Sequence, residues 1–308
     1  MKYSHCSSHS GGEGSKSCTG AIYRTRRIPM KTRIQSSMVL SILAGLFLNS
    51  GICFGQVKYN FSTEKPLNYD FKIDGTISYQ YEGVPAQEFS VLSKGRIRID
   101  TIEKVGEICA MKLTPSRTFV KLNDMVLEDF TGSETARSQV ISAAMMEIRE
   151  NGEVVSATEI SPGILNLSQM LMMIPDFPAR LRSGTRWQKT IPAFSLPGVP
   201  MCALRFTYVY NPAEEGSSRI ELLSNQSIRE QKRDGDVSVS FTGRNSSKGE
   251  FLFDENEGEL TSFSGVIDLI LSVVFKVPPG PDQKPSTKQS LPLRMNIKLN
   301  VSLSEIAG

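Results

Sequence analysis

The chain has 308 residues, of which 39% are apolar, and it carries 35 basic and 32 acidic side chains. Residues 1–55 hold seven of the basic and one of the acidic residues, which leaves 28 basic and 31 acidic residues, a net charge of −3, in residues 56–308. Such a mildly acidic chain without basic clusters lacks the electrostatic footprint of a nucleic-acid-binding protein, whereas its apolar content predicts a sizeable core.

Residues 1–55 have the organisation of an export signal. Basic residues, among them Arg24, Arg26 and Arg27, precede an apolar run over residues 38–48. That run is much shorter than the roughly 20 apolar residues of a membrane-spanning helix, so it suits the apolar region of a signal peptide. We expect cleavage near Gly55, which leaves a periplasmic or extracellular protein without a transmembrane segment.

Three alternatives for this leader stay open, and each of them exports the protein. The first alternative to ordinary cleavage near Gly55 is attachment of a lipid to Cys53. Ile52 argues against it, because a lipid-attachment signal has a small residue at that position. Met30 begins a complete signal peptide, so translation starts there or at the first residue. The pair Arg26-Arg27 also loosely resembles a twin-arginine signal.

The chain after the leader lacks histidine, because His5 and His9 both lie in residues 1–55. This removes histidine-activated nucleophiles and the usual ligand sets for zinc, copper and non-haem iron. No pair of acids stands out as the two carboxyl groups of a glycosidase. We therefore predict a protein that is not an enzyme, with no catalytic residue, no metal site and no cofactor. Cys109 and Cys202 lie in apolar runs, and they either pair or are buried as small apolar side chains.

Alternation of apolar and polar residues predicts β-strands along the first half of the exported chain. The expected strands cover residues 57–61, 67–81, 89–102 and 107–122. Residues 140–148 and 154–160 are predicted to form a hairpin, because Asn151-Gly152 tolerates the positive φ angles of a tight turn.

Residues 161–174 carry the only helical pattern outside the leader. Ser161 is a good N-cap, and a proline suits the first helical position that follows it. Apolar residues recur at helical spacing, at Ile164, Leu167, Leu171 and Ile174. Within segment 161–200, which joins the two parts of the exported chain, we expect this short helix to plug or strap an open sheet.

The second half of the exported chain again predicts antiparallel strands. The expected strands cover residues 201–210, 219–230, 237–242, 250–254, 260–277 and 291–303. In residues 291–303 every odd position is apolar, so one face of a long strand is apolar from end to end. The predicted fold class is mainly β with a minor α element: a long curved antiparallel sheet or half-barrel with one short mid-chain helix. Residues 56–308 form this domain, either as one unit or as two β halves, 56–160 and 201–308.

Short motifs in the exported chain resemble a known group of sequences. They are Ile174-Pro175-Asp176-Phe177-Pro178, Gly184-Thr185-Arg186-Trp187, and Gly249-Glu250-Phe251-Leu252-Phe253-Asp254 with Gly258-Glu259-Leu260. The resemblance is to exported bacterial proteins of unknown function, although Thr185 stands where that group has an acid. The architecture is also distantly similar to the half-barrels of periplasmic lipoprotein carriers, whose concave apolar sheet is covered by helices. Because the group has no established activity, the resemblance implies no catalytic residues.

Two functions remain open for a non-enzymatic protein of the cell envelope. The first is to bind a lipid-like or other apolar ligand in the curved sheet. Flexible methionines adapt to varied apolar partners, and the candidate ligand-binding residues are Leu167, Met170, Leu171, Ile174 and Trp187. The alternative is a structural or protein-interaction module without a ligand cavity, peripherally associated with the envelope. A continuous apolar cavity would favour the first function, and a filled interior would favour the second.

Overall fold

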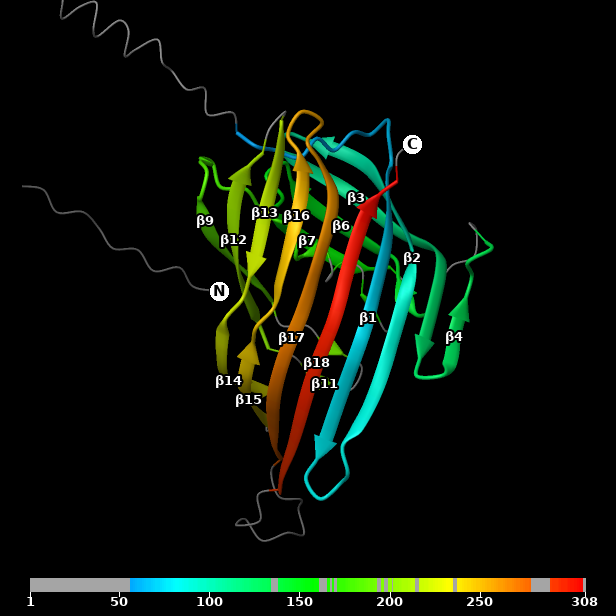
Figure 1. Cartoon of the computed structure of the whole chain (residues 1–308), viewed down its shortest axis with the longest axis vertical. Coiled ribbons are helices and arrows are strands. Elements are labelled where there is room, and N and C mark those ends of the chain that lie inside the picture. Colours follow the sequence, from blue (N-terminus) through cyan, green and yellow to red (C-terminus); the bar gives the residue numbers. More distant parts are fainter. Residues whose placement is uncertain are drawn as a thin grey trace, which may run out of the picture. The chain divides into compact units, whose positions relative to one another are not determined.

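The computed structural model describes residues 56–133, 138–160, 165–166, 168, 171–192, 195–196, 199–200, 202–213, 216–234, 237–277 and 289–306. The described residues belong to one compact unit, Phe54–Gly308, and form a 14-stranded sheet with two small two-stranded pairs (Figure 1). Among them only Ser168 and Leu171 are helical. The prediction of a mainly β fold built on a large, open antiparallel sheet is confirmed.

Eleven strands of this sheet follow one another along a single path, and every neighbouring pair is antiparallel. The order is β7 (Val154–Glu159), β6 (Ala144–Arg149), β3 (Ile108–Leu122), β2 (Gln87–Val105), β1 (Leu67–Tyr81), β18 (Gln289–Glu305), β17 (Glu259–Val277), β16 (Lys248–Asp254), β13 (Ser217–Leu223), β12 (Leu204–Pro212) and β9 (Arg186–Ile191). The earlier and the later strands of the chain form separate blocks of this path, and the two blocks meet where β1 pairs with β18. β7 and β9 are the two edges of the path.

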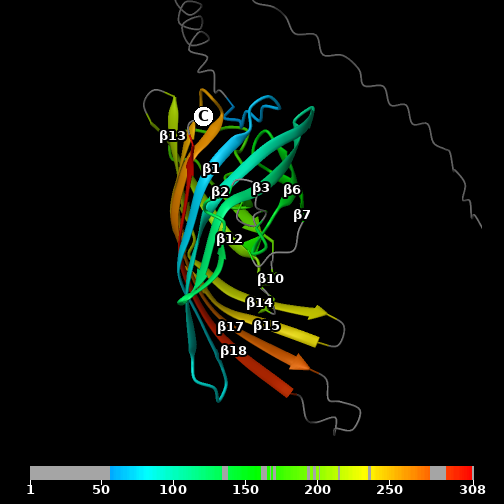
Figure 2. The same ribbon diagram turned by 90° about the vertical axis from the view of Figure 1, so that its right-hand side faces the viewer.

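The remaining strands extend or flank this path. β4 (Met125–Asp129) pairs with β3, and β14 (Gln226–Asp234) pairs with β15 (Val237–Asn245). The first part of β17 pairs with β16, and its second part pairs with β15. Figure 2 shows the lower ends of β14, β15, β17 and β18 turning away from the upright strands. The two small pairs are β5 (Ile141–Ser142) with β8 (Leu165–Asn166), and β10 (Ser195–Leu196) with β11 (Val199–Pro200).

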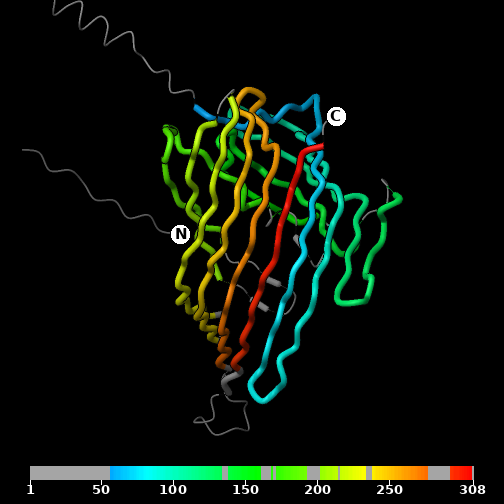
Figure 3. The backbone as a smooth tube through the Cα atoms, in the orientation of Figure 1, coloured from blue at the N-terminus to red at the C-terminus, as the bar shows by residue number. Residues whose placement is uncertain are grey.

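The long central strands bury one face and expose the other. The traces of β1, β2, β17 and β18 run side by side in Figure 3. In β18, Leu293, Met295 and Ile297 are buried, whereas the intervening Arg294 and Asn296 are exposed. The predicted alternation of this strand is confirmed, and its apolar face belongs to the single core of the unit.

The strand–turn–strand motif that begins at Gly249 has a packing explanation. Gly249 and Gly265 lie opposite each other on β16 and β17, and a Cβ added to either would lie 2.8 Å from the ring of Phe263. That ring stacks on Phe251 with centroids 4.3 Å apart. The two glycines therefore make room for an aromatic pair on the buried face. At the following turn, Asp254 Oδ1 accepts the backbone N–H of residue 256 at 2.8 Å.

Residues 57–61, predicted as a strand, form an extended segment without strand pairing. Their alternation persists, because Val57, Tyr59 and Phe61 are buried. Tyr59 N donates to Glu150 O at 2.6 Å, and Asn60 N donates to Gly258 O at 2.8 Å. The segment therefore connects the β6–β7 turn to the β16–β17 turn, where it packs on the core instead of extending the sheet.

The prediction of one continuous helix over residues 161–174 is wrong. Leu165–Asn166 form β8, which pairs in parallel with Ile141–Ser142, while residues 172–173 form a turn and residue 174 a bend. Of the helical pattern, Ile164 and Leu167 lie outside the residues whose side chains are described. Leu171 and Ile174 are buried as predicted, because a spacing of three residues suits a single turn as well as a helix.

Two further differences concern the second half of the chain. The strand predicted over residues 219–230 is two strands, β13 and β14, which occupy different places in the sheet. Cys109 and Cys202 are both free and buried, which is the second of the alternatives left open for them.

Candidate binding site between the two sheet edges

The space between the sheet and residues 171–177 is filled by side chains. The cavity that remains there has a volume of about 30 Å³, and its wall includes Tyr69, Ile99, Met111, Met146, Leu171 and Ile174. That volume accommodates about one or two water molecules, whereas small-molecule sites usually measure roughly 300–1,000 Å³. This interior chamber has no room for a ligand in the conformation described.

The structure brings together only part of the predicted ligand-binding set. Leu171 and Ile174 line the interior chamber. Trp187 does not; it stacks on Tyr208 with ring centroids 5.4 Å apart. Side chains of the other two candidates, Leu167 and Met170, lie outside the described residues.

Residues 171–178, which we call the strap, cross from one edge of the sheet to the other. Three successive carbonyl oxygens of the strap each accept a hydrogen bond from a side chain of another element: Met173 from Tyr208 at 2.7 Å, Ile174 from Lys189 at 2.9 Å, and Pro175 from Tyr59 at 3.1 Å. At its other end, Phe177 N donates to Asn151 O at 2.6 Å. Since Lys189 lies on β9 and Asn151 in the β6–β7 turn, the strap is fastened to both edges.

Beside the strap, the two edges enclose a slot, which we call the edge slot. Residues 153–157 form one wall, residues 188–192 form the other, and Met172 and Asp176 of the strap lie between them. Its volume is about 400 Å³. It therefore has the size of a binding site, in contrast to the interior chamber.

Both walls of the edge slot present backbone groups that face away from the strand with which each wall pairs. In an antiparallel pair, alternate residues bond the neighbouring strand and the residues between them face away. Tyr210 N donates to Thr185 O, and the register from there leaves Gln188 and Thr190 directed away from β12. On β7, the bond from Ile160 N to Ala143 O leaves Ala157 directed away from β6.

Three charged side chains line the edge slot: Glu153, Asp176 and Lys189. Burial raises the pKa of Asp176 above its ordinary value, against the opposing effects of the Lys189 charge and of a hydrogen bond from Trp187 Nε1 at 3.2 Å. Burial likewise lowers the pKa of Lys189, and the negative charges of Asp176 and Glu153 oppose that shift. Glu153 is also ion-paired, since Arg149 Nε lies 3.2 Å from its Oε2. The two carboxyl groups of the slot are therefore balanced by Lys189 and Arg149.

These charged residues were not predicted from the sequence as part of a site, although the sequence carries a signal for two of them. Asp176 lies within the motif Ile174-Pro175-Asp176-Phe177-Pro178. Lys189 shares its strand face with Trp187 and the buried Ile191, so it is a cation at a position where the alternation predicts an apolar side chain.

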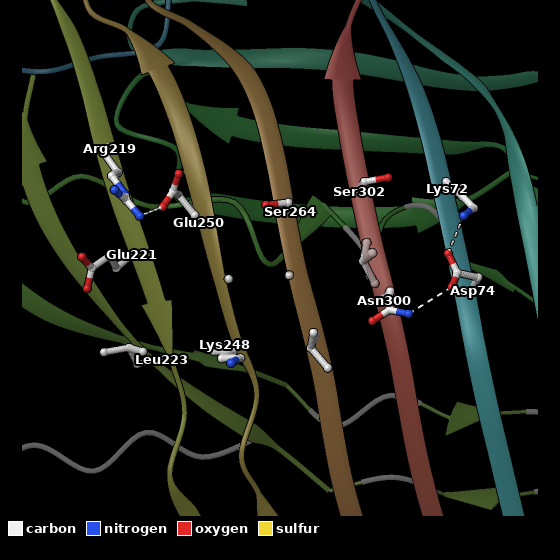
Figure 4. Close-up of a pocket in the computed structure, with 14 residues that line it drawn as sticks. Lys72, Asp74, Arg219, Glu221, Leu223, Lys248, Glu250, Ser264, Asn300 and Ser302 are labelled. Carbon is white, nitrogen blue, oxygen red and sulfur yellow. Dashed lines mark hydrogen bonds and ion pairs between the residues drawn. The ribbon is translucent and has the colours of Figure 1, made fainter.

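A larger depression of about 560 Å³ lies on the outer face of the sheet, across β13, β16, β17, β18 and β1 (Figure 4). Its charges neutralise one another: Lys72 Nζ lies 2.8 Å from Asp74 Oδ1, and Arg219 forms an ion pair with Glu250. Asn300 Nδ2 also donates to Asp74, at 3.0 Å. The side chains lie along the strands and do not converge on one point, so we prefer the edge slot as the candidate site.

The described residues provide neither a metal site nor a membrane-spanning helix. Within the described ranges, no three Asp, Glu, Cys or His side chains are placed to hold a metal ion. The same ranges contain no helix of the length and apolar character needed to cross a membrane. Compared with models of known protein families and with curated proteins, the sequence matches none, so the resemblance to exported proteins and lipoprotein carriers stays a prediction.

Proposed function

We propose that this protein is an exported, non-enzymatic module of the cell envelope that binds another polypeptide at the edge slot. The observation that carries the proposal is the contrast between the two spaces. The slot between the sheet edges measures about 400 Å³, whereas the chamber inside the sheet measures about 30 Å³. A filled interior favours the interaction module over the ligand carrier, and unpaired strand edges are templates on which further strands assemble.

The apolar side chains beside the β7 edge support a protein partner. Val155 and Ile160 are exposed to 45% and 52%, respectively. Solitary strand edges are usually protected from pairing by charges or prolines. Apolar residues at a free edge are instead typical of a surface that a partner covers.

A ligand carrier is the second candidate, and the construction of the strap favours it. The strap is held by hydrogen bonds from side chains and is not paired with a strand. Its residues Leu171 and Ile174 cover the apolar wall of the interior chamber. Displacement of the strap would expose that wall to an apolar ligand. Native mass spectrometry of the protein purified from its own envelope, followed by lipid extraction, tests this candidate: a stoichiometric lipid would favour the carrier.

Site-specific photocrosslinking in the native envelope tests the polypeptide-binding function. A photoreactive amino acid replaces Val155 at the β7 edge, and a control variant carries it at Leu252, which is exposed to 43% on the outer face. We expect a discrete crosslinked protein from position 155 and none from position 252. Equal crosslinking at both positions, or none at 155, would contradict the proposal.

A further inference from the structure

Three segments meet at the corner of the sheet where β18 ends. Glu305 is the last residue of β18 and lies opposite Tyr69 of β1, and the neighbouring strand β17 begins at Glu259. Just beyond the strand, Ile306 N donates to Asn68 O at 2.9 Å. Because the two blocks of the path meet where β1 pairs with β18, this corner is one end of the seam between them.

Glu305 carries a carboxyl group where the alternation of β18 predicts an apolar side chain. Buried residues such as Ile297 and Leu303 occupy the odd positions of this strand. Tyr69, which lies opposite Glu305, is only 3% exposed, and Glu305 is half-buried at the margin of the same face. Glu259 is buried as well, with 8% exposure. Both carboxyl groups are therefore partly removed from water.

A hydrogen bond joins the carboxyl groups of Glu259 and Glu305. An ionised carboxyl group has no proton to donate, so this bond requires a proton on one of the two groups. Lys65 provides positive charge, with its Nζ 3.6 Å from Glu259 Oε2, but its side chain is 60% exposed, so that water screens the charge. Asp254 adds the negative charge of a third carboxyl group.

The balance of these effects favours the protonated form of Glu305. Burial raises the pKa of Glu305 above its ordinary value, and the charge and hydrogen bond of Glu259 and the charge of Asp254 raise it further, against the opposing charge of Lys65. With a raised folded-state pKa, the protonated group stabilises the fold fully below the unfolded-state value of about 4.3. That stabilisation is lost as the pH rises through the folded-state pKa.

We propose that Glu259 and Glu305 form a carboxyl latch: a shared proton closes this corner of the sheet at acidic pH, and ionisation of both groups loosens the end of β18 as the pH rises. The titratable residues at the latch do not line the edge slot; they are Lys65, Tyr69, Asp254, Glu259 and Glu305. The latch therefore operates independently of the proposed function and adds a response to acidity at the seam between the two blocks.

Glu305→Gln tests the latch, because glutamine keeps a donor for Glu259 at every pH and carries no charge. Urea midpoints of wild type and variant are compared at pH 4 and at pH 8, so that the other carboxyl groups cancel in the difference. We expect midpoints within about 0.1 M of each other at pH 4, and a variant midpoint at least about 0.3 M higher at pH 8. Glu88→Gln on the exposed face of β2 is the control, and its difference from wild type should be the same at both pH values.

Two further measurements locate the effect. In a Glu259→Gln background, Glu305→Gln should no longer raise the midpoint at pH 8, because the repelling partner is gone. Amide hydrogen exchange at Ile306, corrected for its intrinsic pH dependence, should become at least about threefold faster between pH 5 and pH 8 in wild type. In the Glu305→Gln variant the corrected rate should stay constant.

Three outcomes would contradict the latch. A midpoint difference between Glu305→Gln and wild type that is the same at pH 4 and pH 8, or negative at pH 8, would overturn the shared proton. A gain at pH 8 that persists in the Glu259→Gln background would overturn the pairing of these two residues. Exchange at Ile306 that does not change with pH in wild type would overturn the loosening of β18.

Discussion

Lys189 Nζ lies 2.9 Å from the carbonyl oxygen of Ile174, and this hydrogen bond ties the edge strand β9 to the strap. The strap continues to Phe177, whose N–H bonds Asn151 O in the turn that leads into β7. The two edges are thus connected through the strap although they do not pair with each other. This cross-connection positions both the chamber beneath the strap and the slot beside it.

Replacing Lys189 with methionine should reveal the contribution of this tie. Methionine preserves most of the aliphatic length but leaves Ile174 O without its donor and Asp176 without the nearby positive charge. Loss of one partner of a buried hydrogen bond typically costs about 1–3 kcal/mol of unfolding free energy. Urea denaturation measures the loss, with Lys248→Met on the exposed outer face as control, expected within about 0.5 kcal/mol of wild type. Equal midpoints for the two variants would show that the tie contributes nothing.

Glu128 should make stability depend on pH in a defined direction. Burial acts to raise the pKa of Glu128, but hydrogen bonds from Ser138, Thr118 and the N–H groups of Gln139 and Val140 outweigh it and lower the pKa. Because the pKa is lower in the folded than in the unfolded state, the carboxylate stabilises the fold above the ordinary Glu value of about 4.3. That stabilisation disappears as the pH falls through the folded-state pKa.

The variant Glu128→Gln should therefore be less stable than wild type at pH 7, and the difference should shrink toward pH 3. Urea midpoints at several pH values measure this, with the exposed Glu88→Gln as a control that lowers stability at neither pH. A gap that widens on acidification would contradict the assigned direction of the pKa shift.

The one-sided burial of β18 predicts a contrast between two neighbours. Ile297 is only 5% exposed, so an aspartate there places an unpaired charge among apolar side chains. The expected loss is several kcal/mol, comparable with the stability of a typical domain. Asn296→Asp on the exposed face should cost within about 0.5 kcal/mol. Asn296 is a better control than Asn300, because Asn300 donates to Asp74 and a carboxylate there would face that acid. Equal shifts in the urea midpoints would contradict the one-sided burial.

Gly152 should be the glycine whose replacement disturbs the strap. Its φ is +91°, and an added Cβ would lie 2.3 Å from Pro175 O and 2.6 Å from the Tyr59 ring. Gly83 is the matched control, because its φ is +76° but nothing lies within 4 Å of an added Cβ. Gly83→Ala should cost roughly 1–2 kcal/mol for the positive φ alone. Gly152→Ala should cost about 1–3 kcal/mol more, since the strap must shift. Similar losses of unfolding free energy in the two alanine variants would show that the strap accommodates the methyl group.

The extent to which the fold was predictable differs between elements. β1 spans Leu67–Tyr81, as the alternation predicts, and the hairpin across Asn151-Gly152 forms with Gly152 at positive φ. Both features depend on local properties: side chains alternate with a period of two, and glycine tolerates a left-handed backbone. The helix over residues 161–174 was mispredicted because pairing with a distant strand, β5, interrupts the local pattern.

The candidate site was predictable only in fragments. Leu171, Ile174 and Trp187 were identified from apolar spacing and aromatic character, yet only the first two share the interior chamber. Glu153 and Lys189 were overlooked because, in the sequence, a charged residue near a turn or within a strand is usually an ordinary surface group. Only the approach of β7 and β9 places them in one slot with Asp176.

The sequence by itself determined the antiparallel β class, most of the strands and the face that each long strand buries, because these follow from local alternation and turn chemistry. It also determined that residues 56–308 contain no histidine. Only the tertiary structure decided which strands are edges, that the interior is filled, and that the two edges enclose a slot lined by charged residues. These features depend on pairing between segments far apart in the chain, and such pairing is not encoded in any single stretch of residues.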